Sequence, residues 1–362
     1  MRRSDVPTPA LLVDIDILDR NIAIMADWSR QSGVRLRPHA KAHKCVEVGQ
    51  RVMAAGALGI SCATIGEAEA MALGGIAGIL ITAPLTSGEA LERLRRLLQR
   101  GADIAIVADH PDSVKKLADL AAGSGRKLGI LVDVDVGMGR TGCHDIADAV
   151  ALARQVKAAS SLHYAGIQAY WGNLQHVTPF AERVQRIGVQ MQRVRATVEA
   201  LSAAGLKPGI VSGGGTGSHR IDATAGLFSE IQPGSYLFMD SAYRAISISE
   251  NDNPFQPSLF VAATVVSVNS PGRVVVNAGW KAFAADSGKP AALRGAPAGG
   301  EFHFMGDEHG ALDFASDAAK PKLGSVIEFL TSHCDPTVNL YGAFHVVCGD
   351  EVIDIWPIRA RY

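Results

Sequence analysis

Short apolar runs alternate with amphipathic helical patterns from residue 10 to about residue 245. The first apolar run, at residues 10–15, predicts a β-strand. Residues 17–31 predict an α-helix, because Leu18, Ile22, Met25 and Trp28 recur close to the spacing of one helical face. This alternation is typical of α/β proteins.

Eight further apolar runs follow, each of them succeeded by a crossover segment. Near-continuous apolar strands of this kind are typical of parallel sheets that are buried on both faces. Eight such units predict an α/β fold with a closed parallel (β/α)8 TIM barrel. The expected strands are residues 34–38, 59–64, 78–83, 103–108, 128–136, 164–170, 209–212 and 230–238, and helices are expected at 65–73, 88–99, 112–122, 147–159 and 179–204.

The pattern changes after about residue 245, where strands are no longer separated by long helices. This change predicts a C-terminal, mostly antiparallel β domain, which the N-terminal strand can join. We expect the N-terminal strand segment to span residues 1–20, the barrel 21–250 and the β domain 251–362, with the boundary near the polar connector 251–254. The expected strands of the second domain are 258–268, 273–278, 325–330, 343–348 and 352–357.

Charge and composition favour a small-molecule ligand. The 362 residues include 35 Lys and Arg against 36 Asp and Glu, so no net charge attracts nucleic acid or an anionic membrane. We expect no signal peptide and no membrane span, since no apolar run approaches about 20 residues. The five cysteines are scattered and form neither a disulfide framework nor a CxxC metal motif, which fits a reduced cytoplasmic setting.

Residues 37–44 (RPHAKAHK) form a basic stretch at the expected carboxyl end of the first barrel strand. Strand ends of this kind carry the chemistry of barrel enzymes. A lysine among other cations is expected to have a lowered pKa, which would favour a Schiff-base role for Lys41. A solvated basic turn is the alternative interpretation.

Further polar candidates follow the fifth and sixth strands. A glycine-containing turn would place Arg140 over the barrel mouth, where its guanidinium could hold a ligand phenolate or carboxylate. Pairing of Arg140 with Asp133 or Asp135 is the structural alternative. Tyr170 could stack on a flat ring or simply close the top of the barrel, and His176 follows it in the chain.

A glycine-rich turn, residues 212–218 (SGGGTGS), follows the seventh strand, and residues 234–236 (GSY) lie at the eighth. Exposed backbone N–H groups and hydroxyls of this kind can wrap a phosphate, and barrels commonly bind phosphate at this place. The turn lacks the Gly-Lys-Ser/Thr ending of a Walker loop, and it is not the dinucleotide-binding fingerprint.

A histidine and an aspartate two residues apart, His333 and Asp335, form a candidate metal site in the second domain. In an extended segment both side chains would point the same way, and imidazole with carboxylate suits Mn²⁺, Zn²⁺ or a similar ion. This short pattern is common by chance. Residues 307–310 (DEHG) form another polar cluster, either near the same site or a β-turn.

An amine, an arginine and a phosphate-binding turn together suit pyridoxal 5′-phosphate. The chain resembles the D-threonine aldolase family, relatives of D-serine dehydratase within the alanine-racemase-like fold of pyridoxal-phosphate enzymes. The stretches that carry the resemblance are residues 8–11, 37–44, 134–140, 213–218, 234–240, 307–310 and 333–337, and they follow the family order along nearly the whole chain.

The resemblance implies a role for each matching residue. Lys41 would be the Schiff-base lysine, Arg140 would contact the cofactor's phenolic oxygen, and Tyr170 would lie beside the ring. Gln232 would lie near the pyridine nitrogen. The phosphate would be held by Thr216, Gly217, Gly234 and Ser235, and the divalent metal (Mn²⁺, with Mg²⁺, Zn²⁺ or Co²⁺ as alternatives) by His333 and Asp335. Related dehydratases typically have cysteine in place of Asp335, which favours an aldolase.

The expected activity is that of an aldehyde-lyase that cleaves D-3-hydroxy amino acids of the D-threonine type to glycine and an aldehyde. The base that deprotonates the substrate's 3-hydroxyl would be His43, His176 or a metal-held hydroxide. The alternatives are a D-serine or 3-hydroxy-D-aspartate dehydratase, a non-catalytic pyridoxal-phosphate-binding protein and a metallohydrolase. The resemblance also suggests a homodimer.

Overall fold

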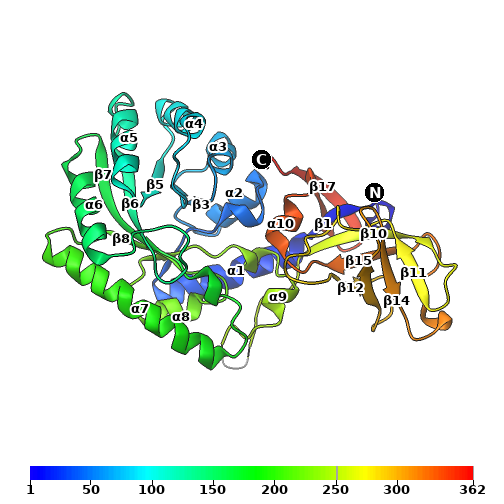
Figure 1. Cartoon of the computed structure of the whole chain (residues 1–362). Helices are drawn as coiled ribbons and strands as arrows, with labels where there is room; N and C mark the ends of the chain where they lie inside the picture. Colours follow the sequence, from blue (N-terminus) through cyan, green and yellow to red (C-terminus); the bar gives the residue numbers. More distant parts are fainter. Residues whose placement is uncertain (250–251, 362) are drawn as a thin grey trace.

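The computed structural model describes residues 1–249 and 252–361. A parallel sheet wrapped by helices occupies one side of the molecule, and a mostly antiparallel sheet occupies the other (Figure 1). The expected combination of a TIM-type parallel sheet and a C-terminal, mostly antiparallel β domain is therefore confirmed. Asn251, the first residue of the expected connector, lies outside the described residues.

The parallel sheet has eight strands in the order β2-β9-β8-β7-β6-β5-β4-β3. The two ends of this order meet through an isolated bridge between His39 and Ser61 and through a 2.9 Å bond from the Leu58 N–H to the Leu36 carbonyl. The sheet thus curls back on itself. Its strands are β2 (Arg35–Leu36), β3 (Ile60–Cys62), β4 (Ile79–Ile81), β5 (Ile104–Ala108), β6 (Leu128–Val134), β7 (Leu162–Ala169), β8 (Ile210–Gly213) and β9 (Glu230–Ile231).

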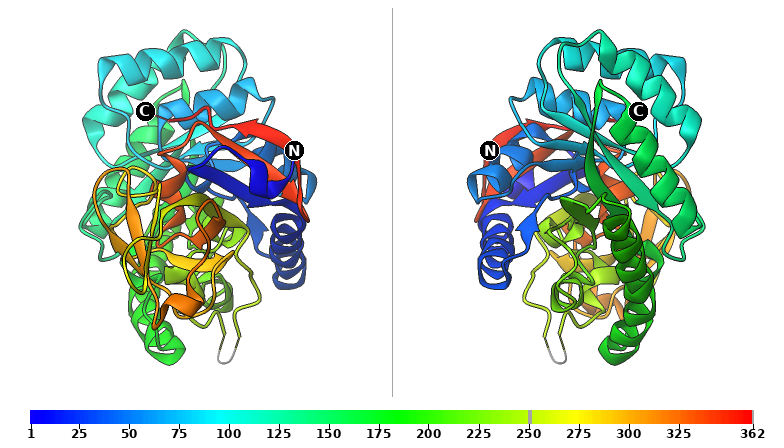
Figure 2. Two further views of the ribbon diagram at one scale, coloured as in Figure 1. Left: turned by 90° about the vertical axis from the view of Figure 1, so that its right-hand side faces the viewer. Right: turned by 90° about the vertical axis from the view of Figure 1, so that its left-hand side faces the viewer.

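Helices cover the outer face of this sheet, and the long α7 runs along its side (Figure 2). Side-chain caps fix several helix starts: Thr64 accepts from the Glu67 N–H, and Ser87 accepts from the Ala90 N–H. The outer helices are α2 (Val46–Ala54), α3 (Ile65–Leu73), α4 (Gly88–Gln99), α5 (Pro111–Ala122), α6 (Ile146–Ala158), α7 (Phe180–Ala203) and α8 (His219–Thr224). The long helix α1 (Ile15–Ser32) leads from β1 to β2.

The second sheet has nine strands and includes the N-terminal strand. Strand β1 (Ala10–Asp14) pairs antiparallel with β10 (Leu259–Ser267) and parallel with β16 (Ala343–Cys348). All five residues of β1 are buried, which agrees with its central place in the sheet. The remaining strands are β11 (Arg273–Val276), β12 (Ala291–Arg294), β13 (Glu301–Phe304), β14 (Gly310–Asp313), β15 (Val326–Leu330) and β17 (Glu351–Pro357).

Several sequence predictions in both parts of the chain were incomplete or wrong. Strands β12, β13 and β14 were not predicted, because they are short and only partly apolar, and none of the four residues of β12 is buried. The expected strand 230–238 is shorter, since β9 ends at Ile231 and a 3-10 turn (Ser235–Leu237) follows. The DEHG segment forms the exposed connection between β13 and β14, where the Met305 N–H donates to the His309 carbonyl. The segment thus closes a β-hairpin, and its last residue, Gly310, is the first residue of β14.

One hydrophobic core cluster draws side chains from both sheets, including Leu11, Ile60, Ile130 and Phe329. Within the described part of the chain, no helix combines the length and apolarity needed to cross a membrane. The five cysteines are free, and four of them are buried.

Candidate active site

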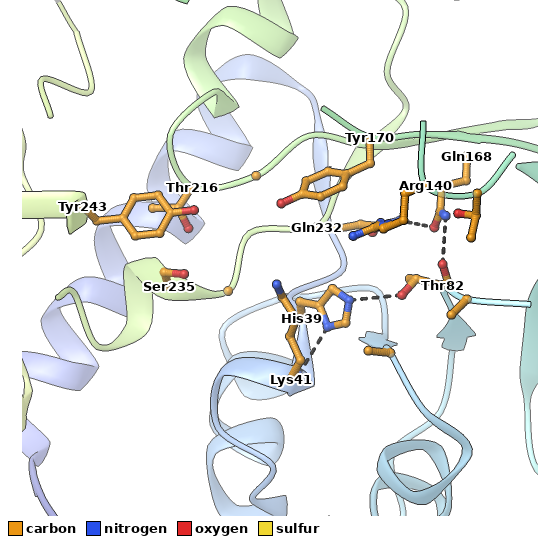
Figure 3. A pocket seen from close by; sticks show the side chains of 15 residues that line it. His39, Lys41, Thr82, Arg140, Gln168, Tyr170, Thr216, Gln232, Ser235 and Tyr243 are labelled. Carbon is orange, nitrogen blue, oxygen red and sulfur yellow. Dashed lines mark hydrogen bonds between the residues drawn. The ribbon is translucent and has the colours of Figure 1, made fainter. Parts of the chain in front are cut away.

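A cavity of about 290 Å³ opens among the loops that follow the barrel strands. It collects seven of the predicted cofactor-binding residues from sites dispersed along the chain: Lys41, Arg140, Tyr170, Thr216, Gln232, Gly234 and Ser235. Figure 3 shows Thr216, Ser235 and Tyr243 on one side of Lys41, and Arg140 and Gln232 on the other. The cavity therefore has a hydroxyl-rich end and an amide- and guanidinium-bearing end, with a primary amine between them.

The Lys41 amine faces a carboxylate from the second sheet domain. Lys41 lies on a short 3-10 turn (Ala40–Ala42) that follows β2, and its Nζ is 3.2 Å from Asp335 Oδ2. The charge of Asp335 raises the pKa of Lys41 above its ordinary value, which outweighs the opposing effect of burial. The prediction of a lowered lysine pKa was wrong for this state of the protein.

The reason for that error is that the neighbouring cations are already neutralised. Arg37 pairs with Glu230 at 2.7 Å, and Lys44 Nζ lies 2.7 Å from Glu67. Burial, together with the charge of Lys41, keeps the pKa of His39 well below its ordinary value, so this ring is neutral. The solvated-turn interpretation does not hold either, because Arg37, His39, His43 and Lys44 are buried.

His39 is held in one tautomer at the cavity wall. Its Nδ1 accepts from the Lys41 backbone N–H at 3.3 Å, so the proton lies on Nε2, which is 3.1 Å from Thr82 Oγ1. The Thr82 hydroxyl in turn donates to the Cys62 carbonyl. Thr82 was missed by sequence reasoning, although its place at the end of a predicted strand was an available signal.

The glycine-rich turn is held from behind by Gln175. Gln175 Oε1 accepts from the Gly217 N–H at 2.9 Å, and its Nε2 donates to Ser218 Oγ at 2.9 Å. Gly215 and Thr216 line the cavity, whereas Gly217 does not. The structure thus brings Thr216, Gly234 and Ser235 to the cavity and turns the N–H of Gly217 away toward Gln175.

Arg140 is presented by a turn that Asp135 organises. One oxygen, Asp135 Oδ1, accepts from three successive backbone N–H groups, those of Gly137, Met138 and Gly139, at 2.9–3.1 Å. The Arg140 guanidinium carbon lies 5.6 Å from the centre of the Tyr170 ring. The Asp133 carboxylate accepts from Thr141 and from Gln168.

His333 and Asp335 lie at the start of a short helix, α10 (Cys334–Val338), rather than in an extended segment. The predicted extended geometry was therefore wrong. Asp335 contacts Lys41, and His333 Nδ1 is 2.6 Å from Asp286 Oδ2. Within residues 1–249 and 252–361, no group of three or more His, Cys, Asp or Glu side chains could hold a metal. Asp286 was missed, and no sequence pattern marks it.

The two candidate histidine bases have different surroundings. His43 is fully buried, does not line the cavity, and burial lowers its pKa to about 4. His176 is exposed, and its ring centre is 4.2 Å from that of Tyr243. Partial desolvation lowers the pKa of His176 and outweighs the opposite effect of the Asp240 and Asp335 charges. Neither histidine is among the side chains that line the cavity, but the ring of His176 packs on that of Tyr243, which does line it.

Comparison with known families matches the two parts of the chain separately. Residues 13–242 match the family described as alanine racemase, N-terminal domain. Residues 258–347 match the family described as putative serine dehydratase domain.

Curated relatives and solved structures extend this likeness over the whole chain. A D-threonine aldolase from Arthrobacter sp. is 39% identical over 98% of this chain and 93% of its own length, and a 3-hydroxy-D-aspartate aldolase from Paracoccus denitrificans (strain Pd 1222) is 35% identical over 100% and 94%. The crystal structure of D-threonine aldolase from Filomicrobium marinum superposes with a TM-score of 0.95 at 38% identity, covering 100% of this chain and 97% of that one.

A dehydratase shares the same fold at greater distance. D-threo-3-hydroxyaspartate dehydratase from Delftia sp. HT23 has a TM-score of 0.85 at 27% identity, and the match covers 99% of each chain. The aldolases match more closely in both sequence and structure. The chain belongs to the D-threonine aldolase family of carbon–carbon lyases, a branch of the alanine-racemase-like enzymes that implies pyridoxal 5′-phosphate as cofactor.

Proposed function

We propose that this protein is an aldolase that cleaves D-3-hydroxy amino acids to glycine and an aldehyde with pyridoxal phosphate and a divalent metal. The observation that carries the proposal is the position of Lys41. Its amine shares one cavity with Thr216 and Ser235 and lies 3.2 Å from Asp335, the acidic member of the candidate metal pair.

The residues around the cavity fit pyridoxal phosphate. Thr216, Gly234 and Ser235 would hold the phosphate, Lys41 the aldehyde carbon, and Arg140 with Tyr170 the ring and its phenolic oxygen. When bound, the cofactor supplies the electron sink that makes cleavage of the Cα–Cβ bond feasible. Thr216 Oγ1 accepts from the Tyr236 N–H at 3.1 Å, so the hydroxyl hydrogen of Thr216 would be directed to another acceptor such as the phosphate.

The metal pair fits an open site with two protein ligands. A metal-binding histidine usually holds a carboxylate through its second ring nitrogen. His333 Nδ1 is paired with Asp286 in this way, so Nε2 would be the nitrogen available to an ion, and Asp335 would supply a carboxylate oxygen. A divalent ion there would act as a Lewis acid toward a substrate hydroxyl.

The chain's own side chains account for proton handling and orientation. Asp335 raises the pKa of Lys41 and so favours its ammonium form in the free protein. The amine would have to pass a proton to a neighbouring group before it could bond to the aldehyde carbon of the cofactor. We propose His176 as the group that takes the proton of the substrate's 3-hydroxyl, because it is exposed beside Tyr243 and has a lowered pKa. His43 is buried and therefore does not take this role. Its Nδ1 instead accepts from the Cys45 N–H, which supports the backbone of residues 40–45.

We further propose that residues 21–250 hold the cofactor and residues 251–362 supply the metal ligands. The contact between Lys41 and Asp335 supports this division, because it joins the barrel to the second part of the chain. A homodimer and a cytoplasmic location remain predictions from the family resemblance and the cysteine content. Size-exclusion chromatography with light scattering measures the first of these directly.

The experiment that tests the function is product analysis. The protein, loaded with pyridoxal phosphate, is incubated with D-threonine, D-serine and D-3-hydroxyaspartate, each with Mn²⁺ and with a chelator. Glycine and an aldehyde, formed only with the metal, are the expected products. Ammonia and a keto acid would instead establish the dehydratase alternative, which the fold of the Delftia enzyme makes the strongest competitor.

A further inference from the structure

A chain of buried hydrogen bonds crosses the floor of the cavity and ends at Gln232. Arg37 pairs with both oxygens of Glu230, at 2.7 and 2.9 Å, and Glu230 Oε1 accepts from Ser212 Oγ at 2.7 Å. Ser212 donates its only hydroxyl hydrogen to this carboxylate. Its oxygen can therefore only accept from Gln232, whose Nε2 lies 2.8 Å away.

A second chain of hydrogen bonds reaches Gln232 from the other side and requires the same orientation of its amide. Gln168 Nε2 donates to the Thr82 carbonyl and to Asp133 Oδ1, both at 3.0 Å. A backbone carbonyl cannot donate, so this end of Gln168 must be its NH₂ group. The other end, Gln168 Oε1, then accepts from Gln232 Nε2 at 3.2 Å.

The opposite orientation of these amides is excluded by donor counting. Rotating Gln232 would set its oxygen against Gln168 Oε1 and leave the Ser212 oxygen without its donor. Rotating Gln168 as well would place its oxygen against the Thr82 carbonyl. Each such arrangement leaves buried polar groups unpaired, which costs about 1–3 kcal/mol per group.

We infer that Gln232 presents its carbonyl oxygen, and not its NH₂ group, to the ligand, so the cavity selects a ligand that has a hydrogen-bond donor at this place. Both Nε2 hydrogens are used within the protein, and Oε1 is the remaining polar atom of a side chain that lines the cavity. The inference rests on the proposed function for the identity of the ligand.

For the proposed cofactor, that donor is a protonated ring nitrogen. In pyridoxal phosphate the nitrogen is para to the carbon that bears the aldehyde, so it points away from the lysine. In Figure 3, Gln232 lies on the opposite side of Lys41 from Thr216 and Ser235. An acceptor there stabilises the N–H form of the ring, which is the stronger electron sink. The hydrogen-bond chain would thus favour the protonated form of the cofactor ring.

The test uses the full-length protein loaded with pyridoxal phosphate that carries ¹⁵N in its ring. The spectrum is recorded at a pH at which the nitrogen of the free cofactor is unprotonated. A ¹⁵N shift in the pyridinium range is expected. A shift in the range of neutral pyridine overturns the inference while leaving the proposed function intact, whereas a protein that does not bind the cofactor overturns both.

A binding comparison provides a second readout. Dissociation constants are measured for pyridoxal phosphate and for its analogue in which C–H replaces the ring nitrogen. The unaltered protein should bind the natural cofactor about 10-fold more tightly, the size expected for one hydrogen bond to a charged donor. In Gln232→Met this preference should disappear, and a preference that survives the substitution contradicts the assigned role.

The neighbouring Ser212→Ala variant is the matched control. It removes one anchor of the Gln232 amide but leaves the bond to Gln168, so the orientation of Gln232 should persist. The preference for the nitrogen-containing cofactor is expected to remain in this variant. Its loss would show that the two anchors do not fix the amide as inferred.

Discussion

Replacing Arg37 by methionine is expected to destabilise the folded protein markedly. Arg37 and Glu230 form a two-point ion pair between β9 and the residue that follows β2, and their side chains are 9% and 0% exposed. A third bond joins the guanidinium to the Gly78 carbonyl. The substitution leaves the Glu230 carboxylate buried without its partner.

The size of the effect follows from the cost of an uncompensated buried charge, which is about 3–5 kcal/mol. For a chain of 362 residues, the entropy of unfolding of about 2 cal/mol/K per residue converts this loss to a decrease in Tm of roughly 5 °C. The double variant Arg37→Met/Glu230→Gln removes the charge but keeps an acceptor for Ser212. It should recover more than half of the lost stability.

Urea unfolding, followed by circular dichroism on the cofactor-free protein, measures these differences. The single and double variants are compared with the unaltered protein under identical conditions. A loss below about 1 kcal/mol in the single variant would refute the reasoning, since such a value is typical of an exposed pair. So would a double variant that is no more stable than the single one.

Three further substitutions test the site. Lys41→Ala should abolish the visible absorbance of the loaded protein as well as turnover, and a retained absorbance band would argue against this lysine. Asp335→Asn should remove both activity and its stimulation by Mn²⁺, and a variant with normal metal response would reject the carboxylate as a ligand. Burial raises the pKa of Asp222 to about 7 from 3.8, so the folded state retains a proton that the unfolded chain releases, and stability should fall by up to about 4 kcal/mol as the pH rises from 4 to 7. Urea titrations across that range should show that the unfolding free energy of Asp222→Asn changes less with pH than that of the unaltered protein. An unchanged pH dependence would exclude Asp222 as the source of the effect.

The barrel could be predicted because its strands are buried on both faces and therefore appear as continuous apolar runs. The helices 65–73 and 88–99 were predicted at their observed bounds, since Thr64 and Ser87 mark their starts. In the second sheet the same reasoning failed. Strand β12 has little buried surface, so its position depends on pairing with β15, which no local pattern records.

The candidate site was predictable where chemistry follows a strand end, as at Lys41, Arg140 and Thr216. It was not predictable where the partner comes from a distant part of the chain. The lowered pKa expected for Lys41 neglected Asp335, which reaches the amine from the second sheet domain. Asp286 lies on a connection without a motif and Tyr243 on the short helix α9 (Ser241–Arg244), and only the folded chain brings them near His333 and His176.

The central place of β1 also constrains how the protein is made. Its residues pair with β16, so Leu12 lies opposite His345, nearly the whole chain apart. The ribosome makes β1 long before it makes β16. The β1 segment must therefore wait, unpaired on that side, until β16 has been synthesised, and contacts of such long sequence separation are slow to form. Chaperone dependence during expression should accordingly be greatest for chains truncated before residue 343.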